Sequence, residues 1–356
     1  MKNKKNKKYC LGIESTAHTF GAAVVEFTEQ PDEESGGKYR GIGNARILSN
    51  VRDAFSTEEG GMIPAEVADH HVRVCKDVVK RAVEEAGIKP EDINLISYSR
   101  APGIGHTLRI GAMAARSLAI ALKPEMGLVG VNHCIAHLEI GRLLTDSTDP
   151  VLLYASGANT QIIAYEGGKY RIFGETLDIG IGNFLDQFAR ELGLGFPGGP
   201  KVAELAEKGR RYIELPYVVK GMDLSFGGIL TYVKKIINSD DFRSGRITKE
   251  DLCFSVQETV FAMLTEVSER AMAHCGKKEL LLGGGVACNT RLQEMCKIMA
   301  EERNAKAFFV PNQFNIDNAA MIAWQGVLQR EQTISPEEAD IDPYERTDDV
   351  KVFWRI

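Results

Sequence analysis

A short pattern that occurs twice constrains the fold of this sequence more than any other feature. Residues 11–19 and 152–160 each read as a strand, a turn of small residues and a second strand, and Ser15 and Ser156 are each followed four positions later by a Thr. After both copies, apolar strands alternate with segments of helical periodicity, which is typical of α/β folds with largely parallel sheets. The recurrence therefore predicts two similarly built lobes with a cleft between them.

The rest of the chain is assigned around these two copies. We expect a basic tail over residues 1–8, a first lobe over 9–150, a second lobe over 151–334 and an acidic surface tail over 335–356. Outside the second copy, strands are expected at 9–13, 20–27, 93–99, 128–131, 279–282 and 307–310. Helices are expected at 63–86, 109–122, 184–192, 230–237, 249–274, 289–302 and 318–329, and a hairpin loop or insertion at 29–44.

Composition excludes several classes of protein. The 356 residues include 43 basic and 49 acidic side chains, which gives a net charge of −6 and no global basic footprint for nucleic acid. The nine Lys and Arg residues between Lys201 and Arg246 form either a local phosphate-binding patch or solvated helix faces. Seven cysteines without a CxxC pair argue against a disulfide framework. Because neither a membrane span nor a signal peptide is evident, we expect a cytoplasmic protein.

The segment His133-Cys-Ile-Ala-His137 is the sharpest chemical signal in the sequence. It follows the expected strand 128–131 and lies at the start of a helix. Residues four apart on a helix share one face, so both imidazoles can bind one metal ion. The alternative is that they only satisfy hydrogen bonds at the helix start. A zinc metalloprotease is disfavoured, because its HExxH motif has a Glu where this sequence has Cys134.

Two further side chains are candidates to complete such a site. Asp317 lies between the last expected strand and the last expected helix, where it either faces a cleft as a ligand or caps the helix that follows. Tyr154 lies at the end of the strand that opens the second half, where it either offers a phenolate or packs in the sheet. A ligand set of imidazole, carboxylate and phenolate groups favours iron or another first-row ion over the zinc that thiolate ligands would favour.

Three turns of small residues are candidates for nucleotide binding, at Ser15-Thr16, Ser156-Gly-Ala158 and 283–289. Their backbone N–H groups can approach phosphate oxygens closely, and the third turn precedes a helix, whose N-terminus favours anions. Each turn alone is more often structural, and neither a P-loop nor a Rossmann fingerprint is present. Their positions on matching elements of a duplicated chain favour a nucleotide site, where Asp186 either holds a ribose hydroxyl or solvates its helix.

Seven motifs, taken together and in this order, resemble those of one protein family. They are Gly12-Ile-Glu-Ser-Thr16, Asn132-His-Cys-Ile-Ala-His137, Tyr154-Ala-Ser-Gly-Ala-Asn-Thr-Gln161, Asp186-Gln-Phe-Ala-Arg190, Phe196-Pro-Gly-Gly-Pro200, Gly283-Gly-Gly-Val-Ala-Cys-Asn289 and Asp317-Asn318. The sequence resembles the catalytic subunit of the KEOPS complex in its archaeal form, a tRNA N6-adenosine threonylcarbamoyltransferase related to bacterial TsaD. The resemblance extends over residues 10–330.

The resemblance implies a fold of the actin/hexokinase/Hsp70 (ASKHA) type, with an ATP- or AMP-type nucleotide bound between two lobes. It also implies one metal ion, most often iron, with zinc or another divalent ion as alternatives, held by His133, His137, Tyr154 and Asp317. The family's substrate contacts correspond to Tyr154, Ala155, Ser156, Gly157, Ala158, Asp186, Gly199 and Asn289. The sequence departs from the family's pattern at Ala158, where Gly is usual, and at Ala203, where Glu is usual.

For activity, the resemblance implies transfer of the threonylcarbamoyl group of threonylcarbamoyl-AMP to N6 of the adenosine 3′ of the anticodon, in tRNAs that read codons beginning with A. The implied partners are tRNA, a small atypical kinase, its regulator and a small dimerising subunit on the first lobe. Because the sequence stops soon after Trp354, we expect no fused kinase domain. The alternatives are an ATP-dependent small-molecule kinase of the same architecture and a nucleotide-regulated assembly subunit without catalysis. No general base is assigned.

Overall fold

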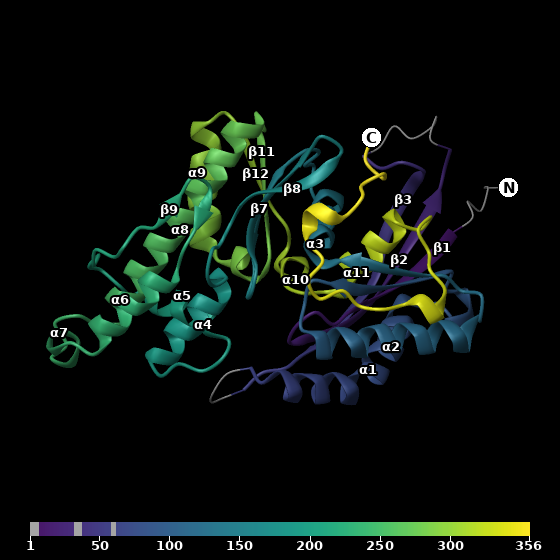
Figure 1. Ribbon diagram of the computed structural model, residues 1–356, viewed down its shortest axis with the longest axis horizontal. Helices are drawn as coiled ribbons and strands as arrows, with labels where there is room; N and C mark the ends of the chain where they lie inside the picture. The colour runs from purple at the N-terminus through teal and green to yellow at the C-terminus, as the bar shows by residue number, and fades with distance from the viewer. Residues whose placement is uncertain (1–6, 32–37, 58–61) are drawn as a thin grey trace.

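Two five-stranded sheets surrounded by helices form the computed structural model, which describes residues 7–31, 38–57 and 62–356 (Figure 1). The first sheet has the strand order β3-β2-β1-β4-β5. Its first three strands are antiparallel, and β4 and β5 extend it in parallel from β1. The elements of this repeat are β1 (Lys7–Glu14), β2 (Thr19–Glu29), β3 (Ile42–Ala54), α1 (Pro64–Ala86), β4 (Leu95–Ala101), α2 (Gly105–Leu122), β5 (Leu128–Asn132) and α3 (His133–Leu144).

The second sheet repeats this plan. Its order is β12-β11-β6-β7-β8, in which β6, β7 and β8 are antiparallel and β11 and β12 continue in parallel from β6. The expected duplication is therefore confirmed strand by strand. The elements are β6 (Val151–Ala155), β7 (Thr160–Glu166), β8 (Lys169–Glu175), α4 (Ile181–Glu191), α5 (Gly198–Ala206), β9 (Val219–Lys220), β10 (Asp223–Leu224), α6 (Gly227–Ile237), α7 (Asp240–Arg243), α8 (Lys249–Cys275), β11 (Glu279–Gly283), α9 (Thr290–Glu302), β12 (Lys306–Phe309), α10 (Asn312–Asn315) and α11 (Ala319–Leu328).

Each repeat ends in a helix that contacts the other repeat. Helix α3 packs on α11 and β11, and α11 packs on β1, β2 and β4 of the first sheet. The backbone of α11 lies so close to β1 that a Cβ on Gly12 would be 2.3 Å from the amide nitrogen of Ala323, so only glycine fits there. Figure 1 shows α3 between the two sheets. The division of the chain into lobes at residues 150 and 334 stays a prediction.

Most expected elements are observed, and the structure adds others that were not predicted, among them β3, β8 and α5. The strand β3 was not predicted, because it lies at a sheet edge and many of its side chains are polar and partly exposed. Helix α2 begins at Gly105, four residues before the expected start. Residues 32–37 of the expected loop and 1–6 of the expected basic tail lie outside the described residues. In the described part of the chain, no helix is long and apolar enough to span a membrane.

The segment after α11 contacts β4 and β5. It then returns to α3, where it is drawn in yellow (Figure 1). Short 3-10 turns form at Pro336–Glu338 and Thr347–Asp349. Many of its side chains are exposed, in line with the expected surface tail. Its end is not: Trp354 is 1% exposed and Arg355 is 8% exposed. The acidic composition of the segment did not indicate this buried end.

Candidate active site

His133 and His137 lie together at the start of α3, directly after β5. The side chain of Asn132 caps the helix by accepting hydrogen bonds from the N–H groups of Cys134 (3.1 Å) and Ile135 (3.4 Å). Because the two histidines are four residues apart on one helix, their imidazoles face the same side. The ring centroids are 4.7 Å apart, and both side chains are buried.

The carboxylate of Asp317 faces both imidazoles. Its Oδ1 lies 3.3 Å from Nε2 of His133 and 3.6 Å from Nε2 of His137. His133, His137 and Asp317 each offer one possible ligand atom, and these three atoms lie within 4.8 Å of one another. The cap of α11 is Asn318, whose Oδ1 accepts the N–H of Met321 at 3.2 Å, so Asp317 is not needed for that task.

A second carboxylate, Glu14 of β1, contacts the opposite edge of His133. Its Oε2 lies 3.0 Å from Nδ1 of His133, and the residue is fully buried. Its Oε1 accepts the backbone N–H and the hydroxyl of Thr16. A carboxylate on the far nitrogen of a ligating imidazole fixes its tautomer and orientation. Glu14 was missed as a site residue, although a Glu within an apolar strand was a signal for a buried, paired carboxylate.

The protonation states within this cluster follow from burial and from neighbouring charges. Burial lowers the pKa of His133, but the carboxylates of Glu14 and Asp317 outweigh it and raise that pKa to about 10. Burial raises the pKa of Asp317, but contacts with His133 and His137 hold it well below its ordinary value. Burial lowers the pKa of His137. Without an ion, Nε2 of His133 therefore carries a proton. A cation held between the two imidazoles and Asp317 would displace that proton, because an imidazole must be neutral to bind a metal.

The donor atoms fit a transition-metal ion. Both ring nitrogens of His137 are buried and have no hydrogen-bond partner among the described residues. A buried imidazole without a partner is costly, and a cation between His133, His137 and Asp317 would satisfy one of these nitrogens. Two imidazoles with one carboxylate suit non-haem iron and other first-row divalent ions. The three residues can thus hold a metal ion.

Tyr154, the fourth predicted ligand, and Ala155 form the end of β6. The Tyr154 ring centroid lies 5.0 Å from that of His137 and 6.3 Å from that of His133. Burial raises the pKa of Tyr154 well above its ordinary value, and a hydrogen bond with Ser156 lowers it only partly. The ring thus lies beside the imidazoles, and its role as a ligand stays a prediction.

Two of the three expected nucleotide-binding turns lie side by side. Gly284 follows β11 at φ 92°, and a Cβ there would be 2.4 Å from the carbonyl oxygen that ends β6. On the other side of the turn, the N–H of Gly182 in α4 donates to the carbonyl of Ser156 at 3.0 Å. Gly157 and Ala158, at the tip of the turn, are exposed. This turn directly follows Tyr154 and Ala155, so its exposed residues are close in sequence to the metal-binding cluster.

Of the other predicted substrate residues, Asp186 lies within α4, while Gly199 and Asn289 lie at the starts of α5 and α9. Asp186 of α4 accepts the N–H of Gly198 at 2.7 Å, at the start of α5 and next to Gly199. Burial raises the pKa of Asp186, and the N–H of Gly198 opposes this. Asn289 caps α9 and donates to Oε1 of Gln257 at 2.9 Å. These contacts hold the side chains in place, and their role in substrate binding stays a prediction.

His18 is a further residue near this site that the sequence did not single out. It lies between β1 and β2, and its ring centroid is 5.9 Å from that of Phe196, in the loop before α5. Its proximity opposes the rise that burial causes in the pKa of Asp186, and it adds to the contacts with His133 and His137 that lower the pKa of Asp317. His18 therefore brings the first turn of one repeat next to a loop of the other.

Known proteins match this chain in sequence over nearly its whole length. The family described as tRNA N6-adenosine threonylcarbamoyltransferase (TsaD) matches residues 46–324. A protein of that name from Thermococcus kodakarensis is 51% identical over 97% of this chain and 99% of its own length. The chain belongs to the tRNA N6-adenosine threonylcarbamoyltransferase family. A Methanosarcina mazei relative named "probable bifunctional tRNA threonylcarbamoyladenosine biosynthesis protein" is 48% identical over 98% of this chain and 60% of its own length. The expected family and transferase class are thereby confirmed.

A solved structure supports the fold independently of close sequence similarity. HypF from T. kodakarensis superposes with a TM-score of 0.59 over 94% of this chain and 49% of its own length, at 14% identity. A likeness at this level of identity concerns the fold alone. Together with the repeated strand order, it confirms the expected two-lobed fold of the actin/hexokinase/Hsp70 type for this threonylcarbamoyltransferase family member.

Proposed function

We propose that this chain transfers the threonylcarbamoyl group of threonylcarbamoyl-AMP to N6 of the adenosine 3′ of the anticodon, in tRNAs that read codons beginning with A. The observation that carries the proposal is the convergence of His133, His137 and Asp317 in a chain half identical to a relative named for this transfer. A small-molecule kinase of the same fold would leave this buried cluster without a role.

The proposed metal ligands are His133, His137, Tyr154 and Asp317, and their nitrogen and oxygen atoms favour iron. When bound, a divalent ion can polarise the carbonyl oxygen of the threonylcarbamoyl group. The chain's own contribution is to hold the ligand side chains in fixed orientations. Glu14 fixes the ring of His133 through Nδ1, so that Nε2 points toward Asp317.

The transfer needs positioning more than a protein nucleophile. Threonylcarbamoyl-AMP is a mixed anhydride, and the adenosine amine is a weak nucleophile because its lone pair is conjugated with the purine ring. The C–N bond forms as the C–O bond to AMP breaks, the amine loses one proton, and AMP leaves as a phosphate monoester whose oxygens can take up that proton. Holding both substrates in line lowers this barrier. Gly157 and Ala158 lie at an exposed turn, where their backbone N–H groups would bind the phosphate.

We assign nucleotide contacts to the residues around this turn. Ser156 and the loop at Gly284 would support the phosphate, and Asp186 with Gly199 would contact the nucleoside. Asn289 would lie on the other side of the same pocket. The methyl group of Ala158 reduces backbone freedom relative to the glycine usual in the family, which affects how closely the phosphate is held.

An apolar groove between α1 and α2 supports a protein partner on the first lobe. The groove has a volume of about 860 Å³ and includes Val72, Val79, Met113 and Leu118. Val72 is 60% exposed and Met113 is 54% exposed. Exposed apolar patches of this kind mark interaction sites. We propose that the small dimerising subunit of KEOPS binds here, and that the small kinase binds elsewhere on the chain, with its regulator as a further member of the complex.

The basic residues between Lys201 and Arg246 are the proposed contacts to tRNA phosphates. The target adenosine lies in a single-stranded loop, from which a base can be splayed into a pocket. Since the substrate is tRNA, we place the reaction in the cytoplasm.

The decisive experiment incubates the full chain with tRNA and threonylcarbamoyl-AMP, with and without the three partner subunits, and measures modified adenosine. We expect product with the parent and with His106→Ala, whose side chain is exposed on α2, and none with His133→Ala. Bound metal, measured on the same three proteins, is expected to fall only in His133→Ala. Absence of product in every condition, beside an active control enzyme, would refute the proposal.

A further inference from the structure

Residues 340–355 form a continuous segment, here called the strap, that follows α3 along much of its length. At its start the hydroxyl of Tyr98 on β4 donates to the carbonyl of Asp340 at 2.9 Å. Further on, Glu345 accepts a hydrogen bond at 3.3 Å from Nδ2 of Asn132, the residue that caps α3. Arg100 of β4 pairs with the same carboxylate at 3.5 Å. The first half of the strap therefore ties the first sheet to the N-terminal end of α3.

The second half of the strap contacts the other sheet. Arg346 pairs with Glu175 of β8 at 3.1 Å, and the hydroxyl of Thr347 donates to Oε1 of Gln161 on β7 at 3.4 Å. Near its end, the guanidinium carbon of Arg355 lies 4.1 Å from the centroid of the Tyr165 ring of β7. The strap thus connects both repeats of the molecule across α3.

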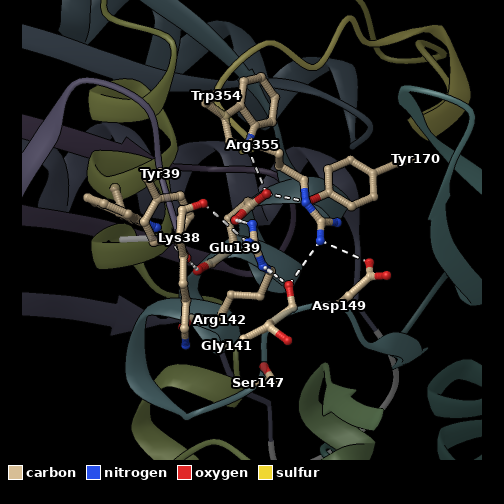
Figure 2. Close-up of polar contacts among 12 residues, drawn as sticks. Lys38, Tyr39, Glu139, Gly141, Arg142, Ser147, Asp149, Tyr170, Trp354 and Arg355 are labelled. Atoms are coloured by element: carbon tan, nitrogen blue, oxygen red, sulfur yellow. Dashed lines mark hydrogen bonds and ion pairs between the residues drawn. The ribbon is translucent and has the colours of Figure 1, made fainter. Parts of the chain in front are cut away.

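Glu139 is the residue of α3 that the buried end of the strap contacts (Figure 2). It is fully buried, and its Oε1 accepts the indole N–H of Trp354 at 2.7 Å. The hydroxyl of Tyr170 on β8 donates to the same oxygen. Its Oε2 accepts a hydrogen bond from Arg142 at 2.8 Å. One buried carboxylate thus joins α3, the strap and the second sheet.

The backbone of this same turn of α3 is also held. The carbonyl oxygen of Glu139 accepts the indole N–H of Trp324 on α11 at 3.2 Å and the hydroxyl of Tyr39 at 3.4 Å. Two residues before Glu139 on the same helix is His137, and six residues before it is His133. Since an α-helix of this length moves as a rigid unit, a shift at Glu139 displaces both imidazoles.

We propose that the strap positions α3, and with it His133 and His137, between the two sheets, and that Glu139 is the positioning residue through which Trp354 acts. This inference rests on the proposed function only in taking the two histidines as metal ligands. It goes beyond that function by giving a role to a segment remote from the substrate residues. Trp354 is the buried large apolar side chain of the strap, while Tyr344 on the same strap is 90% exposed.

The test compares two conservative changes in the full chain. Trp354→Phe removes the indole N–H that Glu139 accepts and keeps an aromatic ring, and Tyr344→Phe removes a hydroxyl from the exposed aromatic of the same strap. Hydrogen exchange is measured for peptides from α3 and from α1, which the strap does not touch in the contacts described. Affinity and stoichiometry for Fe²⁺ are measured without oxygen and without tRNA.

We expect Trp354→Phe to speed exchange in α3 but not in α1, and to weaken Fe²⁺ binding about three- to tenfold at unchanged stoichiometry. The loss is smaller than the 10–100-fold expected for a direct partner of a ligand, since Trp354 acts one contact further away. Tyr344→Phe should match the parent. Parent-like exchange in α3 and parent-like metal affinity in Trp354→Phe, with only a lower melting temperature, would overturn the proposal.

Two further outcomes are decided by the same measurements. If Trp354→Phe does not fold, Arg355→Lys replaces it, because that change keeps the charge toward Asp149 and removes the planar guanidinium over Tyr165. Faster exchange in α3 then supports the strap, and parent-like exchange refutes it. If the parent transfers no threonylcarbamoyl group, the proposed function fails, and the exchange data still decide on the strap.

Discussion

The Nδ1 atom of His133 lies 3.0 Å from Oε2 of Glu14, so a carboxylate on β1 holds an imidazole on α3 by the edge opposite to Asp317. With Nδ1–H donating to Glu14, Nε2 is the ring nitrogen that faces Asp317, and it can bind an ion between them when the ion displaces its proton. The two carboxylates therefore have separate tasks, since Glu14 orients the ring and Asp317 completes the ligand set.

Glu14→Gln should weaken metal binding about 10- to 100-fold, as is typical when the partner of a ligating imidazole is changed. The amide keeps the shape of the side chain but loses the charge that favours Nδ1–H. The measurement is an anaerobic titration with Fe²⁺, with Glu66→Gln on the exposed face of α1 as the matched control. A Glu14→Gln protein that binds Fe²⁺ as the parent does would show that Glu14 has no orienting role.

Substitutions at Asp317 and at its neighbour Asn318 should have different effects, the first on metal binding and the second on stability. Asn318→Ala removes the cap of α11 and the hydrogen bonds from Nδ2 to the carbonyls of Phe314 and Ile316, and is expected to lower the free energy of unfolding by about 1–3 kcal/mol, with metal stoichiometry retained. Asp317→Asn leaves that cap in place and is expected to abolish metal binding. Urea denaturation and metal analysis of both variants distinguish the two tasks. Loss of the helix cap in Asp317→Asn, with metal kept, would reverse this assignment.

The sequence predicted the parts of the site that depend on local spacing. His133 and His137 were recognisable because residues four apart on a helix lie on the same face. For Asp317, the sequence did not decide between a role as metal ligand and a role as the cap of α11. The choice depended on the structure, because Asn318 can also cap a helix, and spacing alone does not tell which of two neighbouring residues does so.

Features that depend on contacts between distant segments were not predicted. Glu14 and His133 are far apart in the sequence, so no local pattern joins them. The burial of Trp354 was not predicted because the segment around it is acidic. The adjacent aromatic residues Phe353 and Trp354 could have indicated a buried end. The two-lobed plan was predicted because the strand pattern at residues 11–19 recurs at 152–160, at the start of both sheets. The actin/hexokinase/Hsp70 type was implied by the resemblance of the seven motifs.

Gly284→Ala should destabilise the protein, whereas Gly285→Ala should not. At Gly284 the backbone has φ 92° and an added Cβ would meet a carbonyl oxygen at 2.4 Å, which makes a cost of about 1–3 kcal/mol the expected result. At Gly285 the nearest atom to an added Cβ is 4.0 Å away, so a change below about 0.5 kcal/mol is expected. Urea denaturation gives both values, and ATP binding should weaken only in Gly284→Ala. Equal stability of the two variants would contradict the close approach to β6.

His71 should make stability depend on pH below neutrality. Burial, followed by the neighbouring His70, lowers the pKa of His71 from 6.5 to about 4. The unfolded chain therefore binds a proton at this ring below pH 6.5, while the folded chain does so only below about pH 4, so stability falls as the pH drops through this window. The full effect on the free energy of unfolding is at most about 3 kcal/mol.

Urea denaturation between pH 7 and about 4.5 should show a smaller loss of stability for His71→Gln than for the parent, and a parent-like loss for the exposed His106→Gln. Identical losses in all three proteins would mean that His71 does not stay neutral in the folded state.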